Sequence, residues 1–477
     1  MFGPMSNSTK AYSRTAFITL ISVFFFWGFV AASNTILIPI FKKHFHLLQW
    51  QSQLVDSAFY AAYFIGSLIY FLLSVSGNDI LNRIGYKKGL VIGLGISALG
   101  ALGFVPAAQM ESFPLMLTSL FIVAMCFSLQ QIVANPYVIA LGSPATGAHR
   151  VSLAGGINSF GTTIGPLLLS FVLFGSIKVA DDAVFELSSV QMPYTVLALA
   201  FVAFALFIAY SALPPVTHEE TSANDFKAFS FPQVILGMIA IFVYVGTEVT
   251  IQSNLPELMR QPEFLGLDSK FTVHFISLYW GSLMIGRWTG ATGAFNLKGN
   301  QKTFARILAP LAAYLVILAV NYIKGSPMSD LYSYFPLVVL IIIGFIITND
   351  KPARIMMVFG TAAAVMMLAG LLTHGYTALY CFISGGLFCS VMWPCIFSLS
   401  LAGLGKYTNQ ASALLIMMIL GGAVLPPLQG FLADKIRIHT SYIVPLLGFL
   451  YLAFFGYKVQ AELGKQGISY DEELTAH

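Results

Sequence analysis

The chain has 477 residues, of which 57% are hydrophobic and only 9% are charged, and its mean hydropathy is +0.80. Soluble domains carry about 25% charged residues, so this composition excludes an ordinary soluble protein and indicates a protein of the lipid bilayer. The net charge of +4 comes without a basic run, which argues against a nucleic-acid partner.

Long apolar segments divide the chain into two groups. A membrane-spanning helix needs about 20 apolar residues. Six such segments lie in 15–213, a polar linker follows at 214–231, and eight more lie in 232–460. We therefore predict an all-α polytopic membrane protein of about 14 transmembrane helices, with an N-terminal six-helix bundle, a cytoplasmic linker and a C-terminal bundle. The predicted spans are 16–40, 54–75, 88–108, 113–141, 150–176, 192–213, 232–257, 271–295, 304–323, 331–348, 352–372, 376–403, 409–433 and 440–459.

The charged residues of the loops predict how this bundle lies in the membrane. With the N-terminus inside, two thirds of the Lys and Arg residues fall on the inner side of the predicted spans. Loops rich in Lys and Arg stay in the cytoplasm. An even number of spans then places both termini in the cytoplasm.

Polar residues interrupt the fourth and fifth segments between Gln130 and Pro166. An unpaired polar group in hydrocarbon costs several kcal/mol, so these residues should face protein or a water-filled cavity. Gln131 and Asn135 are four residues apart and share a helix face, and Asn158 follows in the next segment. Amides both donate and accept hydrogen bonds, as sugar hydroxyls do. The alternative is that they only bond to neighbouring helices.

The two halves repeat each other weakly. Asn135-Pro136 and the residues after it resemble the run that starts at Trp393-Pro394, and Pro166 has a counterpart in Pro426. Parallel repeats of six helices around a site at the membrane midplane are typical of major facilitator transporters. The extra pair of spans in the second half, at 304–348, is then predicted to be an inserted hairpin.

Several short runs, spread over nearly the whole chain outside this hairpin, together carry a family resemblance through their order and spacing. The runs are Ala134–Pro136, Asn158–Thr163, Tyr244–Val249, Tyr279–Arg287, Met392–Leu399, Gly403–Lys406 and Gly421–Asp434. In them the chain resembles the fucose permease branch of the major facilitator superfamily, the fucose–galactose–glucose symporters. The resemblance implies import of a hexose-like monosaccharide or amino sugar through a bacterial inner membrane, driven by protons or sodium.

Two positions depart from that family. Its proton-coupled members resemble one another in an acidic residue on the first helix and another on the fourth, and these positions align with Thr35 and Gln131. Neither side chain titrates, so the usual coupling pair is absent. The loop after the second span also resembles the superfamily, but Asn82 stands where its motif has Asp, which argues against a gating ion pair there.

Charged residues inside predicted spans are the first candidates for coupling. Glu248 lies well inside the seventh span without a basic residue four positions away, and we predict that it binds sugar or the coupling ion. The alternative is a carboxylate that only fixes helix packing. Asp56 is the second candidate, although a carboxylate at a helix start also complements the helix dipole.

Further residues are candidate sugar ligands because of their place in the spans. Asn34 and Thr35 lie on the first helix and Gln252 on the seventh, which face each other across the cavity in the family's fold. Trp280 and Trp393 lie in mid-span, where an indole ring can stack on a sugar or only pack. Structural hydrogen bonding or packing is the alternative for all five.

Other functional classes have less support. The eight histidines are scattered, and HExxH, GxSxG and phosphate-loop motifs are absent, so we do not expect an enzyme such as a membrane-embedded transferase. The four cysteines lie in apolar segments without zinc-site spacing, so no metal, cofactor or disulfide framework is expected. A facilitative uniporter and a membrane sugar sensor remain alternatives. The expected partners are a small sugar and the lipid bilayer, and the chain is expected to be monomeric.

Overall fold

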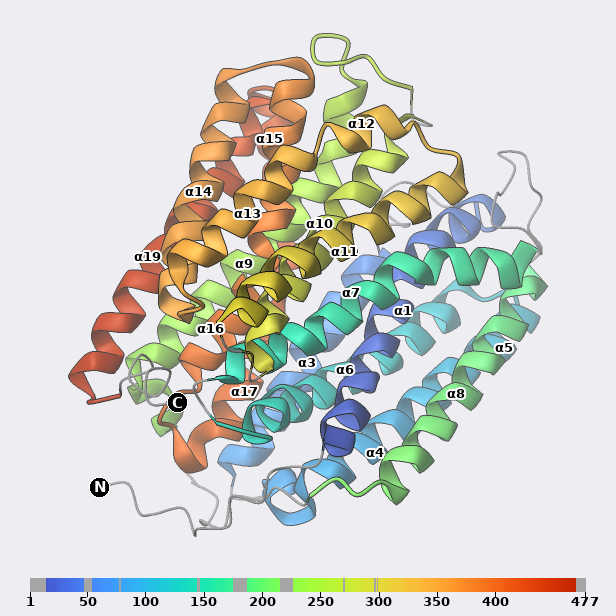
Figure 1. Cartoon of the computed structure of the whole chain (residues 1–477). Coiled ribbons are helices and arrows are strands. Elements are labelled where there is room, and N and C mark those ends of the chain that lie inside the picture. Colours follow the sequence, from blue (N-terminus) through green and yellow to red (C-terminus); the bar gives the residue numbers. More distant parts are fainter. Residues whose placement is uncertain are drawn as a thin grey trace.

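The first half of the chain forms one bundle of helices. The structure is a computed structural model that describes residues 14–46, 54–76, 79–143, 146–174, 187–214, 226–268, 271–295, 297 and 299–468. Within these ranges it contains helices and no strand. Helix α1 packs on α7, α4 on α6 and α8, and α3 on α6 (Figure 1). The bounds are α1 Arg14–His44, α3 Leu54–Val75, α4 Ile80–Leu102, α5 Phe104–Gln109, α6 Phe113–Ala140, α7 Gly147–Phe174, η2 Leu187–Val190 and α8 Gln191–Tyr210.

The second half repeats these pairings. Helix α9 packs on α18, α14 on α15 and α19, and α10 on α15, in the way that α1, α4 and α3 pack in the first half. Two further helices, α11 and α13, pack on α10 and α14 beside this set. The bounds are η3 Lys227–Ser230, α9 Pro232–Arg260, α10 Val273–Ala291, η5 Thr292–Ala294, α11 Asn300–Lys324, α12 Met328–Tyr332, α13 Phe335–Thr348, α14 Pro352–Leu372, α15 Gly375–Cys389, α16 Met392–Ser400, η6 Gly405–Tyr407, α17 Thr408–Met417, η7 Met418–Leu420, α18 Gly421–Lys435, η8 Thr440–Tyr442 and α19 Ile443–Lys465.

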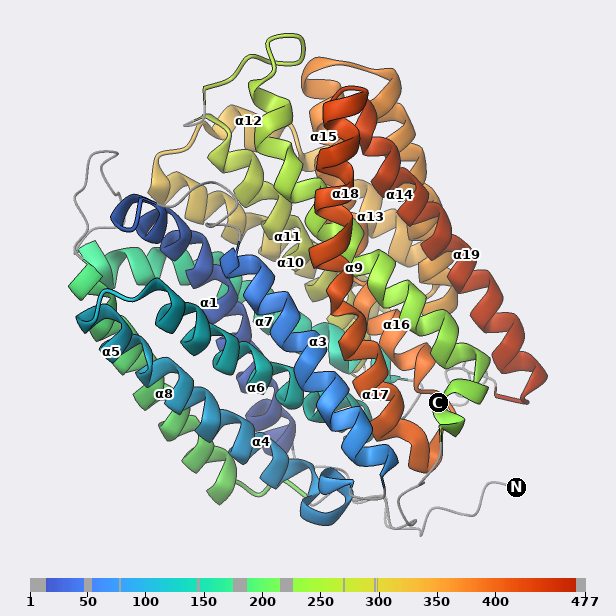
Figure 2. The same ribbon diagram turned by 180° about the vertical axis from the view of Figure 1, so that it is seen from behind.

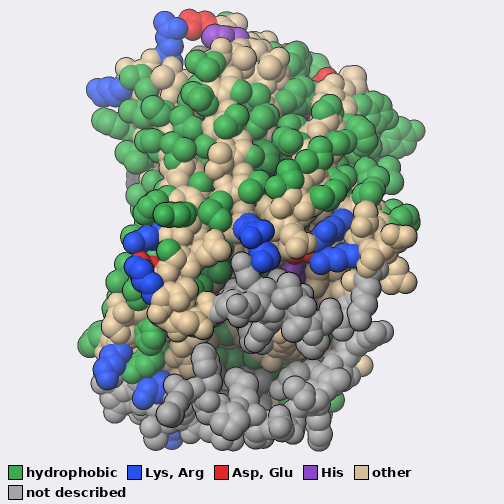
Figure 3. Space-filling view, turned by 60° about the vertical axis from the view of Figure 1, so that its left-hand side comes forward, with side chains coloured by type: hydrophobic (Ala, Val, Ile, Leu, Met, Phe, Trp, Pro, Cys, Tyr) green, Lys and Arg blue, Asp and Glu red, His purple; other side chains and the backbone are tan. Residues whose placement is uncertain are grey.

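The two halves lie side by side with the interface between them along the long direction of the helices (Figures 1 and 2). Helices α7 and α3 of the first half contact α10 and α17 of the second. We call the end at which α1 begins and α19 ends the termini face, and the opposite end the far face. A broad hydrophobic band covers the side in Figure 3, and basic side chains gather mainly below it, toward the termini face.

The predicted number of about 14 membrane spans is not confirmed. Eleven helical segments of the described chain are long and apolar enough to cross a membrane. Helix α10 is not among them, because polar side chains such as Arg287 lower its hydropathy, and in α7 several side chains after Gly165 lie outside the described part of the structure. In α1, the described segment Thr15–Val30 is a shorter apolar helix. The fold is nevertheless that of a multi-pass membrane protein, and both helices of the predicted hairpin 304–348 are among the eleven.

Close contact between α1 and α7 depends on glycine. A Cβ built at Gly28 would lie 2.0 Å from the backbone oxygen of Asn158, and one at Gly161 would lie 2.5 Å from the backbone oxygen of Phe25. Backbone atoms cannot move aside as the end of a side chain can. Small residues are the usual means by which membrane helices approach each other, and here they fix the wall from which Asn158 projects.

Gly28→Val should therefore destabilise the protein. The added side chain overpacks the α1–α7 contact, which typically costs about 1–3 kcal/mol or more. Thermal unfolding of the detergent-solubilised protein should give a lower melting temperature. Gly95→Val on α4 is the matched control, because a Cβ at Gly95 meets nothing within 4 Å. Equal melting temperatures for the two variants would contradict the prediction.

Candidate functional site

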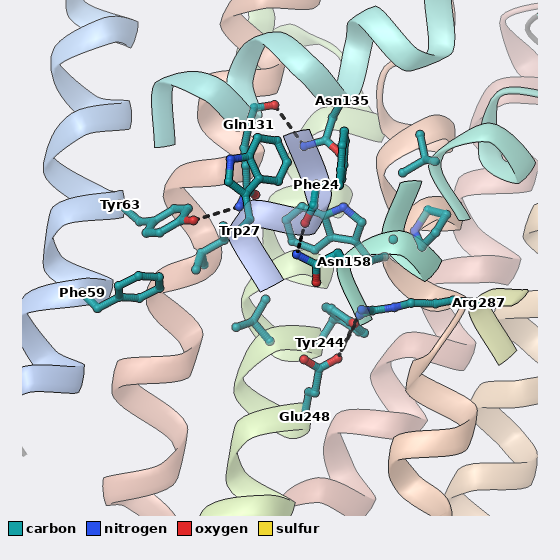
Figure 4. A pocket seen from close by; sticks show the side chains of 16 residues that line it. Phe24, Trp27, Phe59, Tyr63, Gln131, Asn135, Asn158, Tyr244, Glu248 and Arg287 are labelled. Atoms are coloured by element: carbon teal, nitrogen blue, oxygen red, sulfur yellow. Dashed lines mark hydrogen bonds and ion pairs between the residues drawn. The ribbon is translucent and has the colours of Figure 1, made fainter. Parts of the chain in front are cut away.

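A cavity lies between the two halves, about midway along the helices. Its volume is ≈ 210 Å³. Pockets for drug-sized ligands measure about 300–1,000 Å³, so this one suits a small solute. Across the described ranges no three His, Cys, Asp or Glu side chains lie close enough to hold a metal ion. The cavity is lined by Phe24, Trp27, Phe59, Tyr63, Gln131, Asn135, Val151, Gly155, Asn158, Tyr244, Val245, Glu248, Arg287, Trp393, Pro394 and Ile419 (Figure 4).

Three amides form the polar part of the first half's wall. Gln131 Nε2 donates to the Tyr63 hydroxyl at 2.8 Å, and Asn158 Nδ2 donates to the Phe24 carbonyl at 3.0 Å. Asn135 Nδ2 donates to the Gln131 carbonyl at 3.0 Å, but its buried Oδ1 has no hydrogen-bond partner. A buried polar atom without a partner costs about 1–3 kcal/mol. The wall therefore contains a buried acceptor that no protein group satisfies.

The second half contributes an ion pair. Tyr244 and Glu248 lie one turn apart on α9, and the Tyr244 hydroxyl donates to Glu248 Oε2. Arg287 Nη2 on α10 lies 3.9 Å from the same oxygen, and both side chains are largely buried. Arg287 Nη1 also donates to Ser159 Oγ of the first half at 2.7 Å. One carboxylate and one guanidinium thus link α9, α10 and α7 beside the cavity.

Arg287 corrects the interpretation of the sequence. No role was predicted for Arg287, and Glu248 had no basic residue four positions away in the sequence. Helix α10 runs to Ala291, so Arg287 lies inside the helix and its long side chain reaches the cavity. Spacing along α9 could not reveal a partner that comes from another helix.

Aromatic rings complete the cavity. A hydrogen bond fixes Trp27, whereas Trp393 packs on another ring. Trp27 Nε1 donates to Gln130 Oε1 at 2.9 Å, and Gln130 Nε2 donates to Ser97 Oγ at 2.9 Å. Gln130 is fully buried, so it orients Trp27 and does not face the cavity. Trp393 packs on Phe397 with ring centroids 5.8 Å apart and is only partly buried.

The structure brings together only some of the predicted ligands. Gln131, Asn135, Asn158, Glu248 and Trp393 line the cavity.

Of the remaining predicted ligands, Gln252 and Trp280 do not line this cavity. Gln252 lies one turn beyond Glu248 on α9, and Trp280 lies about two turns from Arg287 on α10, both toward the far face. Asn34 and Thr35 lie in α1 and Asp56 in α3, but their side chains are outside the described part of the structure.

Hydrogen bonds join the two halves between the cavity and the termini face. Ser412 Oγ on α17 donates to the Ile132 carbonyl on α6 at 2.9 Å. Proline has no amide hydrogen, so Pro136 leaves that carbonyl without its helical partner. The neighbouring Asn135 does not bond to this carbonyl, because its amide donates to the Gln131 carbonyl.

A buried aspartate was missed in the loop after α3. Asp79 accepts hydrogen bonds from the Tyr70 hydroxyl at 2.8 Å and from Asn409 Nδ2 at 3.2 Å. The Tyr86 hydroxyl donates to Asn409 Oδ1 at 2.6 Å. The carboxylate that Asn82 lacks is therefore supplied three residues earlier in the chain, and it links α4 to α17.

Comparison with known proteins agrees with this arrangement of two repeated bundles around a polar cavity. The profile of the Major Facilitator Superfamily matches residues 15–349, and the chain belongs to that family. A glucose/galactose transporter of Brucella abortus is 33% identical over 460 residues, covering 95% of this chain and 96% of the relative. An L-fucose-proton symporter of Escherichia coli is 27% identical over 462 residues, covering 92% of each chain.

Solved structures point the same way. The crystal structure of the transporter FucP in the outward conformation has a TM-score of 0.73 and 25% sequence identity, and covers 94% of this chain and 99% of that one. The resemblance to the fucose–galactose–glucose symporters is confirmed by these relatives.

Two neighbouring glutamines should differ in what they do. Gln130→Leu leaves the buried Trp27 N–H without an acceptor, which should lower stability by about 1–3 kcal/mol. Gln131→Leu removes an amide from the cavity wall, so it should lower solute binding more than stability. Melting temperature and solute-induced thermal stabilisation of each variant check this. A larger loss of stability in Gln131→Leu than in Gln130→Leu would contradict the assignment.

Proposed function

We propose that this protein imports a hexose-like monosaccharide or amino sugar through a bacterial inner membrane by alternating access. In this mechanism the two halves rock about a site at the membrane midplane and expose it to either side in turn. The termini face would lie in the cytoplasm, as the excess of Lys and Arg on that side supports. The relatives named as glucose/galactose transporters and L-fucose-proton symporters support a sugar as the solute.

The observation that carries the proposal is a cavity between the two halves that is lined by amides and aromatic rings. A sugar hydroxyl can donate to an amide oxygen and accept from an amide N–H. We assign hydrogen bonding to Gln131, Asn135 and Asn158. Trp393 would stack on the apolar face of the ring.

Coupling to a proton or sodium ion would use Glu248. Its carboxylate lies beside the cavity and shares Arg287 with Ser159 of the opposite half. Neutralising Glu248, by a proton or a bound cation, would weaken its attraction for Arg287. Arg287 could then shift toward Ser159 or the sugar, so occupancy by the ion and occupancy by the sugar would be linked. Asp56 remains the second candidate.

Facilitative uniport is the alternative that one observation favours. Thr35 and Gln131 cannot titrate, and Glu248 is already paired with Arg287. A stable ion pair would complete the site without any exchange of ions. A sugar sensor, which binds without moving its ligand, differs from both in the absence of flux.

Reconstituted vesicles separate these alternatives. A panel of labelled glucose, galactose, fucose and glucosamine should identify the sugar. An imposed proton or sodium gradient should then drive that sugar above its equilibrium level inside the vesicles. If the sugar only equilibrates and neither gradient drives its accumulation, the protein is a uniporter. If the sugar binds but does not cross the membrane, the protein is a sensor.

Glu248→Gln tests the coupling residue. It keeps the side-chain shape and hydrogen bonding but removes the charge, so sugar binding should remain within a few-fold. Gradient-driven accumulation should be lost, while exchange of labelled for unlabelled sugar should continue. Glu257→Gln is the matched control, because Glu257 is an exposed carboxylate on the same helix, paired with Arg260. Full accumulation by Glu248→Gln would rule out the role given to Glu248.

A further inference from the structure

A cluster of charges lies at the termini face where the α11–α13 hairpin ends. Asp350, in the turn between α13 and α14, is only 2% exposed. Lys302 Nζ lies 2.9 Å from Asp350 Oδ2, and Arg306 pairs with the same oxygen. Both cations come from the first turns of α11, so the cluster joins the two ends of the hairpin. In Figure 3 several basic side chains lie side by side at this level, with acidic and histidine atoms between them.

The backbone is held in an uncommon conformation to place this carboxylate. Asn349 and Asp350 have positive φ angles of 49° and 60°. Left-handed backbone in residues other than glycine costs of order 1–3 kcal/mol and persists where the surrounding contacts require it. Asn and Asp adopt this conformation more readily than other residues, and Asn349 caps the C-terminus of α13 in it.

Asp350 is also held in its charged form. Burial acts to raise the pKa of this carboxyl, but His149, Arg306 and Lys302 together outweigh it and hold the pKa below its usual range. The site is thus one carboxylate that balances two cations.

The opposite half contacts the end of α10 and η5 at His149, next to the start of α11. This buried side chain, in the first turn of α7, contacts the Gly290 carbonyl through Nδ1 at 2.9 Å. A Cβ at Gly293 in η5 would lie 2.5 Å from the His149 ring. The ring therefore occupies a space beside η5 that is free only because residue 293 is glycine, and we call this space the His149 seat. The charged groups that act on His149 are Asp350, Lys302 and Arg306, all from the hairpin and its last turn.

We propose that the hairpin forms part of the gate at the termini face: Asp350 balances Lys302 and Arg306, so that His149 can stay seated against Gly290 and Gly293. This inference rests on the proposed function, because a gate implies alternating access. The α7–α10 contact must separate when the protein opens at that face. Without Asp350 the two cations on α11 would repel each other and lose the carboxylate that holds the hairpin ends together, which would loosen the packing beside His149 and favour opening. The hairpin would then set how readily the transporter opens to the cytoplasm.

Opening can be measured without any sugar. Ser152 is buried at the α7–α10 contact, where its Oγ lies 3.0 Å from a Cβ built at Gly290. Ser152→Cys should therefore react with a membrane-permeant maleimide only when the gate opens. The parent protein, whose described cysteines are buried, gives the background rate.

In this reporter background, Asp350→Asn should raise the labelling rate about five- to thirty-fold, as expected for one or two kcal/mol. Adding Lys302→Gln should bring the rate back toward the parent, because it removes one of the unbalanced cations. Glu462→Gln is the matched control and should change nothing. Glu462 also balances two lysines, Lys458 and Lys465, but all three lie on α19.

Three outcomes would overturn the proposal. They are an unchanged rate in folded Asp350→Asn, a raised rate that Lys302→Gln does not reduce, and an equal rise in Glu462→Gln. If Asp350→Asn fails to fold, Gly293→Val takes its place, since it blocks the His149 seat and should also raise labelling. Unchanged labelling in that variant would equally overturn the proposal. Absence of sugar flux in the wild type would refute the proposed function and leave the labelling result readable.

Discussion

Hydrocarbon offers no hydrogen-bond partner, so each polar group that enters this bundle needs one from the protein or from the cavity. Trp27, Gln130 and Ser97 satisfy one another in series across α1, α6 and α4. Asn135 satisfies only its nitrogen, and the oxygen of this cavity-lining side chain has no partner. Buried hydroxyls away from the cavity, such as those of Tyr194 and Thr250, also have no partner, so the Asn135 oxygen is distinguished only by its place beside the other amides of the cavity wall.

Periodicity along one helix predicted part of the site, and contacts between helices supplied the rest. The spacing of Gln131 and Asn135 placed both on one face, and both line the cavity. Glu248 was singled out because a carboxylate in a membrane span is costly. Its partner Arg287 could not be found this way, because the pair joins helices whose separation in space is fixed only by the fold. Tyr63 was missed for the same reason.

The fold itself was accessible from composition and from the weak internal repeat. The count of spans is not confirmed, because several side chains of α1 and α7 lie outside the described part of the structure. Helix α10 is not among the eleven because polar side chains such as Arg287 lower its hydropathy. Helices α6 and α9 also line the cavity, but enough of their length is apolar for both to be among the eleven. Asp79 shows a related limit, since a motif position held by Asn82 concealed a carboxylate three residues away.

The bond between Ser412 and the Ile132 carbonyl joins the two halves through neutral groups. Moving one elementary charge across a membrane potential involves about 2.3 kcal/mol per 100 mV. A hydroxyl and a carbonyl carry no net charge, so this bond can break and re-form in each cycle without electrical work. Because Pro136 frees that carbonyl, the two halves gain a contact between neutral groups. The strength of this contact does not depend on the membrane potential. Any voltage dependence of transport would then arise from the charged groups of the cavity and from any ion that crosses with the solute.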